Sequence, residues 1–323
     1  MIRVRPRKAA ALLAGLLTAA VILVAPPAAT AATAATTTTL IGASSVNFAW
    51  FDPAVGPMQI YRDFDNGFSY PTWQDTPAYQ AHPNARANHY SMKILPQRLL
   101  DPTDTINASL RAFIATTPKN IILTNYHEPD DTSPGRFTPA QFRAGIVKFA
   151  GMVRAQNAVD GGARRTSVVL MNISFKSQWT WPVSDWWPTD ARDGGHVDLI
   201  AADVYAMPHA TLTACCPRGY TDGVNWQQAS RLLSFIITFA KANKTPWAVA
   251  ELGYLEDIHD PSRKALALRD AVNVARANGA DHISYFDASG PRADWRLRWS
   301  SPVGSTPKTS QAALMWKSLA NGG

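Results

Sequence analysis

VDLIAADVY, residues 197–205, is the stretch that decides the fold, because it is apolar at all but two positions. An antiparallel strand with one exposed face alternates apolar and polar residues, whereas a parallel strand covered on both faces is apolar almost throughout. We therefore expect eight parallel strands. The other runs of strand length lie at residues 40–44, 58–64, 89–95, 120–126, 167–173, 247–251 and 282–287.

Helical segments separate the later runs. One begins at Thr138, a capping residue followed by proline, and carries apolar residues at helical spacing between positions 142 and 153. Further helices are expected near residues 225–243, 260–279 and 309–319, whereas residues 65–88 are expected to form a long loop. Strands that alternate with helices build βα units, and eight such units close into a (β/α)8 TIM barrel.

The first 31 residues have the features of a secretory signal peptide. Basic residues lie between positions 3 and 8, an apolar segment follows over 9–25, and alanines at 29 and 31 mark a cleavage site. An uncleaved N-terminal anchor is the alternative. Residues 32–39 are expected to form a flexible Thr-rich segment, and residues 40–323 the single barrel domain.

The rest of the chain carries no sign of a membrane or nucleic-acid partner. No later run approaches the ~18 apolar residues that a membrane span requires, so we expect a secreted, extracellular monomer without a membrane contact after signal cleavage. Removing residues 1–31 lowers the formal net charge from +7 to +3. This small excess, without a block of like charges, argues against nucleic-acid binding.

Cys215 and Cys216 are the only cysteines of the sequence. Adjacent Cα atoms lie about 3.8 Å apart across a trans peptide, which is shorter than the usual span of a disulfide. Two alternatives stay open: a strained vicinal disulfide, which export would permit, or two free thiols. Because no metal-ligand spacing or phosphate-binding motif occurs, we expect neither a metal nor a cofactor.

Two glutamates occupy matched positions at the ends of strand-like runs. Glu128 ends the run IILTNYHE before a proline, and Glu251 ends the run PWAVAE before Leu-Gly. The carboxyl ends of barrel strands meet at one face. Partial burial of a glutamate there costs free energy, so its presence suggests a functional role. Two such carboxyls indicate the acid and the nucleophile of a glycoside hydrolase, with a pair of ordinary surface glutamates as the alternative.

The His127-Glu128 pair, the VDLIAADVY run and the run around Glu251 resemble glycoside hydrolase family 26 of clan A, in order and spacing. That family has a His-Glu pair on its fourth strand, an Asp-x-Tyr-like sixth strand and a Pro-led seventh strand that carries the nucleophile. The resemblance implies that Glu128 is the acid/base and Glu251 the nucleophile. It also implies that His127 and Tyr205 support them.

The chain departs from the family's pattern at two places. The family often has a tryptophan on strand 8 beneath the cleaved sugar, where this chain reads SYFD, residues 284–287, so Phe286 or the later Trp295 would take that place. The Arg-Pro-Phe that often leads into the His-Glu pair is Thr-Asn-Tyr here.

Tryptophans crowd the segment after the fifth strand-like run. Indole faces stack on the apolar faces of sugar rings, so we expect this group to bind substrate. The alternative is that these side chains pack a long loop against the barrel. The four residues are Trp179, Trp181, Trp186 and Trp187.

The sequence thus predicts a secreted retaining glycoside hydrolase that cleaves a β-linked polysaccharide by double displacement. By the resemblance, endo-β-1,4-mannan is the first substrate, and another clan A hydrolase acting on β-glucan or β-xylan is an alternative. A non-catalytic carbohydrate-binding barrel is the alternative from a different class. Arg62 and Asp63, at the end of the second strand-like run, are expected to form a salt bridge at the barrel mouth.

Overall fold

The computed structural model describes most of the chain from residue 38 onward. The predicted signal peptide and nearly all of the Thr-rich segment lie outside the described residues, as do Trp179, Trp181, Cys215 and Cys216. Within the described part, no helix combines the length and apolar composition that crossing a membrane requires. The described residues are 38–45, 48–130, 136–176, 182–206, 220–221, 228–257, 260, 262–288, 295–299 and 308–322.

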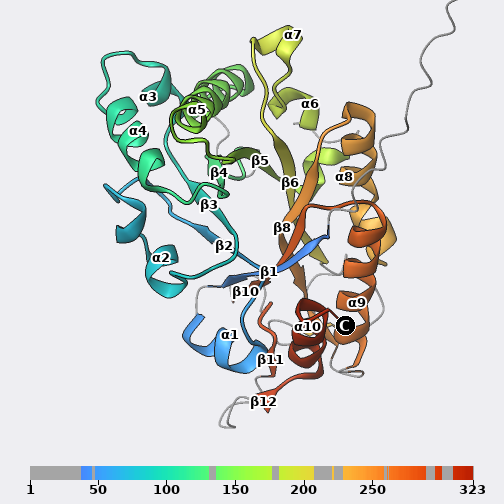
Figure 1. Ribbon diagram of the computed structural model, residues 1–323. Coiled ribbons are helices and arrows are strands. Elements are labelled where there is room, and N and C mark those ends of the chain that lie inside the picture. The colour runs from blue at the N-terminus through green and yellow to red at the C-terminus, as the bar shows by residue number, and fades with distance from the viewer. Residues whose placement is uncertain are drawn as a thin grey trace, which may run out of the picture. The chain divides into compact units, whose positions relative to one another are not determined.

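Eight parallel strands close into a barrel, which confirms the predicted (β/α)8 fold (Figure 1). Strand β1 pairs with β10 along its whole length and with β2 on its other side, so the barrel has no open edge. Each strand overlaps one of the eight predicted runs. The strands are β1 Leu40–Ser45, β2 Ile60–Phe64, β3 Asn88–Met92, β4 Ile122–Asn125, β5 Arg165–Met171, β6 Leu199–Ala206, β8 Trp247–Tyr254 and β10 His282–Asp287.

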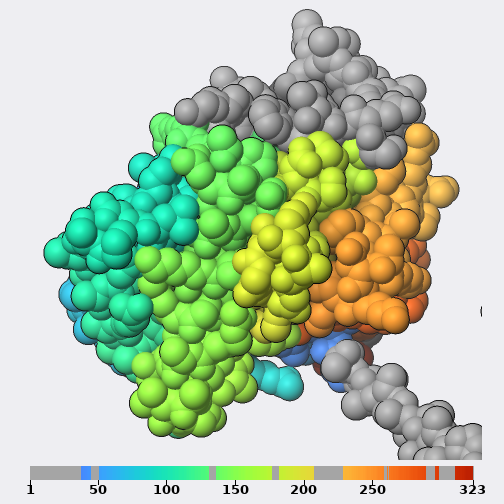
Figure 2. Space-filling view, turned by 90° about the horizontal axis from the view of Figure 1, so that it is seen from above, coloured from blue at the N-terminus to red at the C-terminus, as the bar shows by residue number. Residues whose placement is uncertain are grey.

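Helices connect the strands, and the segments of α4, α5, α7 and α8 follow one another across the surface in chain order (Figure 2). Residues 65–88, expected to be loop, contain the short helices η1 and α2. The helices are α1 Phe48–Val55, η1 Trp73–Asp75, α2 Pro77–Ala81, α3 Pro96–Leu100, α4 Ile106–Thr116, α5 Pro139–Asp160, η2 Asn172–Phe175, α6 Val183–Trp186, α7 Asp190–Asp193, α8 Ala229–Asn243, α9 Ser262–Ala277 and α10 Gln311–Ala320. Two small sheets pair β7 Tyr220–Thr221 with β9 Glu256–Asp257, and β11 Arg298–Trp299 with β12 Lys308–Thr309.

Helix α5 shows how local sequence sets an element boundary. The Thr138 side chain accepts a hydrogen bond from the backbone N–H of Gln141, and the Gln141 side chain accepts one from the Thr138 N–H at 2.8 Å. This reciprocal cap satisfies donors that a helix start leaves free. Gly161 ends the helix in the left-handed region at φ 66°. The helix therefore starts where the sequence predicted.

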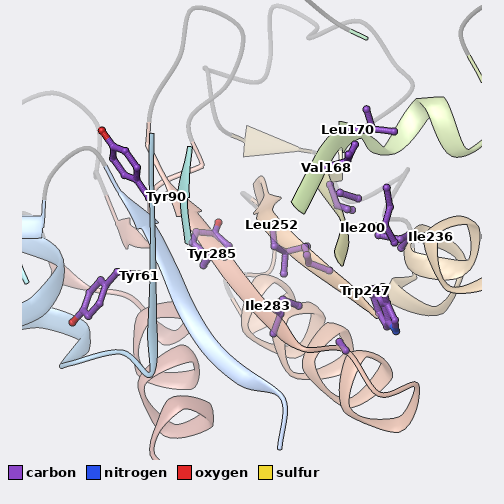
Figure 3. Close-up of a cluster of buried hydrophobic side chains, with 14 of the residues drawn as sticks. Tyr61, Tyr90, Val168, Leu170, Ile200, Ile236, Trp247, Leu252, Ile283 and Tyr285 are labelled. Carbon is purple, nitrogen blue, oxygen red and sulfur yellow. The ribbon is translucent and has the colours of Figure 1, made fainter. Parts of the chain in front are cut away.

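The barrel wall separates two apolar layers. Large side chains point outward from the strands and meet the helices, as Val168 and Ile200 do on the side where Ile236 of α8 lies (Figure 3). The smaller interior holds its own cluster, in which alanines of β6 and β8 meet larger apolar side chains from β2, β4, β5 and β6. Burial on both faces explains why these strands are apolar almost throughout. The interior cluster is Ile60, Ile122, Val169, Leu199, Ala201, Ala248 and Ala250.

A polar group also lies inside the barrel. His89 of β3 lies 2.9 Å from both the Thr124 and the Ser167 hydroxyl and 3.1 Å from His282 of β10. Burial lowers the pKa of His89 well below its usual value, with the Arg62 guanidinium adding to the effect. The neutral imidazole of His89 therefore connects β3 with β4, β5 and β10 through side-chain hydrogen bonds.

Candidate active site

The chain turns sharply after β4 and brings Glu128 to the barrel mouth. Tyr126 and Glu128 both have left-handed backbone angles, φ 59° and 51°, which non-glycine residues rarely adopt. The Tyr126 N–H donates to the Met92 carbonyl of β3, while the Glu128 N–H donates to the Val169 carbonyl of β5 at 2.9 Å. These two hydrogen bonds hold the turn to both neighbouring strands and so stabilise an unfavourable backbone.

The loop beyond Glu128 is anchored from the other side. Asp130 is 8 % exposed and accepts a hydrogen bond from the Met171 N–H at 3.0 Å and one from the Ser174 hydroxyl. Asp130 is therefore a buried structural acceptor. Glu128 is fixed between strand hydrogen bonds before it and this carboxylate after it.

Strand β8 carries a bulge immediately before Glu251. Along β6, Ala202 pairs with Val249 and the next residue, Asp203, pairs with Glu251, so Ala250 has no partner. Side chains of a regular strand alternate between faces, and Ala248 and Ala250 already face the interior. The extra residue of a bulge breaks the alternation, so Glu251 faces inward as well.

Strand β6 supplies two more inward side chains by regular alternation. Leu199 and Ala201 belong to the interior cluster, so Asp203 and Tyr205 continue the same face toward the mouth. The Tyr205 hydroxyl donates a hydrogen bond to Oε2 of Glu251 at 2.5 Å. Tyr205 thus lies where the sequence interpretation put it, against the expected nucleophile.

Three carboxyls and one guanidinium meet at the mouth. One oxygen each from Glu128, Asp203 and Glu251 lie within 4.8 Å of one another. Nη2 of Arg62, whose side chain is fully buried on β2, lies 3.8 Å from Oε1 of Glu251. Carboxyls about 5–5.5 Å apart have the spacing of a retaining glycosidase, whereas inverting enzymes leave about 6.5–9.5 Å for a water.

The surroundings of Glu128 favour its protonated form. Burial raises the pKa of Glu128 to about 7, the Glu251 and Asp130 charges add to the rise, and an Asp203 hydrogen bond and Lys93 oppose it. A carboxyl with a pKa near 7 can both give up and take back a proton at neutral pH. This behaviour is required of a general acid/base.

Asp203 and Tyr205 are also shifted toward their neutral forms. Burial raises the pKa of Asp203 well above its usual value, and the neighbouring Glu251 and Glu128 raise it further, while Arg62 lowers it. Burial, followed by the Glu251 charge, raises the pKa of the Tyr205 hydroxyl. Tyr205 therefore stays a hydrogen-bond donor to Glu251.

His127 lies beside the site as a neutral ring. It is 4 % exposed and packs on Phe64, with ring centroids 5.3 Å apart. Burial lowers the pKa of His127 well below its usual value, with Arg62 and Lys93 contributing. Its Nδ1 atom has no hydrogen-bond partner among the described residues.

An aromatic group lies on the far side of Tyr205. Trp295 is tilted against Tyr205 with centroids 5.0 Å apart, and Phe286 meets the same ring edge-on at 5.7 Å. A Cβ at Gly253 of β8 would lie 2.6 Å from the Tyr205 ring and 2.9 Å from that of Trp295. Glycine at this position therefore lets the two rings pack against β8.

Two of the predicted substrate-binding tryptophans pack elsewhere, which corrects the prediction for them. Trp186 is 3 % exposed and packs edge-on against Phe142 of α5 at 5.6 Å. Trp187 is 7 % exposed and meets Phe239 of α8 at 6.0 Å. Side chains with so little exposed surface are not available to stack on a sugar ring, and Trp295, at 5 % exposed, is equally buried. The predicted role of Trp179 and Trp181 falls outside the described residues.

The sequence interpretation missed two residues of the site. Arg62 donates to the backbone carbonyl of Asp63 at 2.7 Å and faces Glu251, so the expected Arg62–Asp63 salt bridge is replaced by an approach to the carboxyl cluster. Asp203 is the aspartate of the Asp-x-Tyr pattern in the sixth strand-like run, but no role was expected for it. Its signal in the sequence is a charged residue inside an apolar strand, two positions before Tyr205 and hence on the same face.

The three carboxyls are also close enough to reach one divalent cation. The Arg62 guanidinium already places a positive charge beside Glu251, and Glu128 is largely protonated below pH 7. Both features oppose a second cation, so the donor set fits proton chemistry better than metal binding.

Sequence comparison leaves the family open. No protein-family model matches this sequence, and a search among curated proteins found no match. The resemblance to family 26 therefore remains a prediction.

Solved structures share the fold at low sequence identity. A GH128 (subgroup I) endo-β-1,3-glucanase from Amycolatopsis mediterranei aligns with a TM-score of 0.53 and 13% identity, over 86% of this chain and 98% of the other. The catalytic domain of a GH26 endo-β-1,4-mannanase from Bacillus sp. JAMB-750 aligns with a TM-score of 0.54 and 12% identity, over 88% and 86%. An endo-β-1,4-mannanase from Cellulomonas fimi aligns with a TM-score of 0.54 and 10% identity, over 89% and 71%. At these identities the likeness establishes the barrel fold.

Proposed function

We propose that this protein is a retaining glycoside hydrolase that acts on a β-linked polysaccharide. The observation that carries the proposal is the approach of Glu128 and Glu251 to within 4.8 Å at the barrel mouth. Their surroundings differ as the two roles require: Glu128 has a pKa raised to about 7, and Glu251 accepts a hydrogen bond from Tyr205.

The chemistry is a double displacement. Oε1 or Oε2 of Glu251 attacks the anomeric carbon, the glycosidic C–O bond breaks, and the departing oxygen takes the proton of Glu128. A water then gives a proton to Glu128 while its oxygen attacks the same carbon and releases Glu251. Esterified Glu251 carries no charge, so the pKa of Glu128 falls in the intermediate, which favours its action as a base.

Tyr205 and Arg62 fit the task of holding the nucleophile. Tyr205 donates to one Glu251 oxygen, and Arg62 approaches the other at 3.8 Å. Together they fix the carboxylate plane and leave its charge available for attack.

The substrate class is a β-glycan, as predicted from the sequence. Structural neighbours named as β-1,4-mannanases and as a β-1,3-glucanase make these two polysaccharides the first to test, with β-xylan after them. The N-terminal 31 residues support export, so the enzyme would meet its substrate outside the cell.

The test is to incubate the protein with a panel of defined β-glycans and to measure the reducing ends that hydrolysis releases. We expect the wild-type protein to cleave at least one of them. Glu128→Gln and Glu251→Ala should each lose activity by roughly 10³-fold or more, because each removes a group that acts in the transition state.

A control is Asp160→Asn, which removes a carboxylate that pairs with Arg164 at the C-terminal end of α5. This variant should keep its activity if it stays folded. A wild-type protein that binds a β-glycan and never cleaves one would support the carbohydrate-binding alternative and overturn the proposal.

A further inference from the structure

Asp203 is a third carboxyl in the site with no role in the double displacement. It is 1 % exposed, and neither of its oxygens accepts a hydrogen bond from an N–H group or an alcohol or phenol hydroxyl of the described residues. An ionised carboxylate buried without a donor is strongly disfavoured, so this side chain is either neutral or shares a proton.

Glu128 is the neighbour with which Asp203 forms a carboxyl–carboxyl hydrogen bond. Two carboxyls can make such a bond only when one of them carries a proton. The pair therefore holds at least one proton in the folded protein whenever this bond is made.

The surroundings decide which carboxyl keeps that proton. Asp203 is almost completely buried, whereas Glu128 is partly exposed and lies near Lys93, which favours its ionised form. Arg62 acts the other way on Asp203, but two glutamates oppose it. The charged and titratable groups that face the pair are Arg62 of β2, Lys93 after β3, His127 and Asp130 around Glu128, Tyr205 of β6 and Glu251 of β8.

We propose that Asp203 stays a neutral carboxylic acid throughout the reaction and donates a hydrogen bond to Glu128, which makes it the positioning residue of the acid/base. This inference rests on the proposed function, because it gives Glu128 the acid/base role.

The proton balance of the reaction is unchanged by Asp203. The proton that leaves Glu128 goes to the departing oxygen, and the proton that returns comes from water. Asp203 neither releases nor gains a proton. Its O–H steadies the Glu128 carboxylate between the two steps and holds it toward the substrate oxygen.

Two substitutions distinguish whether Asp203 acts as a neutral hydrogen-bond donor or through a negative charge. Asp203→Asn keeps a neutral group of the same shape with N–H donors, so activity should remain within about 10-fold and the pH profile should barely move. Asp203→Leu keeps similar bulk without a donor, and we expect roughly a 100-fold loss of kcat. Loss of a donor to the ionised form raises the pKa of Glu128, so the basic limb of kcat/KM should shift to higher pH.

The opposite pattern would overturn the inference. If Asp203→Asn is as impaired as Asp203→Leu, or if its basic limb moves by more than about one pH unit, Asp203 acts through a negative charge. A purely structural role would lower the amount of folded protein without moving the pH profile of the folded fraction.

A second measurement does not depend on turnover. Infrared spectra of protein labelled with ¹³C-aspartate should show a protonated aspartic acid carbonyl at pH 8, where Asp63, with a pKa that burial raises to about 6, is ionised. This band should vanish in Asp203→Asn, and its absence from the wild type would refute the inference even if the variants fail to fold. A band present in a protein that cleaves no glycan would leave the proton assignment intact and overturn the proposed function alone.

Discussion

At the scale of single residues, the burial that gives Glu128 a pKa suited to acid/base catalysis also lowers the stability of the folded protein at neutral pH. The pKa of Glu128 is raised from 4.5 to about 7, chiefly by burial. Between these two pH values the folded protein holds a proton that the unfolded chain has released. The free energy of unfolding therefore falls as pH rises through this window, and the loss is complete above about pH 7.

Replacing the Glu128 carboxyl with a neutral group should stabilise the folded protein above about pH 7, where the buried carboxylate is ionised. We expect Glu128→Gln to raise Tm by several degrees at pH 8 and to leave it nearly unchanged at pH 4, where the wild-type carboxyl is already neutral. Differential scanning calorimetry of both proteins across this range checks it. Asp104→Asn is the control, because a hydrogen bond from Arg98 lowers the pKa of Asp104, and its loss should not raise Tm at pH 8.

At the scale of elements, irregular backbone aims the reacting groups. Two left-handed residues after β4 and one unpaired residue in β8 turn Glu128 and Glu251 toward each other. Gly253, two residues past Glu251, leaves room for the Tyr205 and Trp295 rings. The site therefore depends on departures from regular strands at the ends of an otherwise regular barrel.

A single methyl group should disturb this arrangement. In Gly253→Ala the new Cβ would lie 2.6 Å from the Tyr205 ring, so the ring must shift and its hydroxyl leaves Glu251. We expect kcat to fall by roughly 10- to 100-fold. Gly151→Ala in α5 is the matched control, since nothing lies within 4 Å of the added methyl there, and it should keep full activity and gain ~0.5–1 kcal/mol of stability. Equal activity of the two variants would count against the positioning role of Tyr205.

The elements also show where sequence reasoning succeeds. Doubly buried strands such as β6 and β8 leave nearly continuous apolar runs, and their regular alternation with helical segments located the remaining strands, although β3 reads NHYSM. The five-residue helices α2 and α3 are too short to show a helical period. Helix α4 carries Leu110, Phe113 and Ile114 on one buried face, and this i, i+3, i+4 spacing is the pattern of an amphipathic helix.

The site could be predicted only in part. Glu128 and Glu251 stand out because glutamate is rare at the end of an apolar run. Arg62 and Asp203 do not, because a charged residue in a strand looks alike in sequence whether it faces inward or outward. Trp186 shows the same limit for aromatics, since an indole that packs against a helix resembles one that stacks on a sugar.

At the scale of the whole molecule, closing the barrel unites groups that lie far apart in the chain. Residues 62, 203 and 251 lie on three different strands and residue 128 follows a fourth, and they meet because every strand ends at the same face. The short spacing of Glu128 and Glu251 predicts the stereochemistry. One oxygen of each lies within 4.8 Å of the other, which matches a retaining enzyme better than an inverting one, whose carboxyls lie about 6.5–9.5 Å apart to leave room for a water.

The most direct measurement is proton NMR of the sugar first released from a β-glycan. The geometry predicts a product that keeps the β configuration before it mutarotates, and an activated 2-fluoro glycoside should label Glu251. A first product of α configuration, or a label on another residue, would contradict the pairing of Glu128 and Glu251.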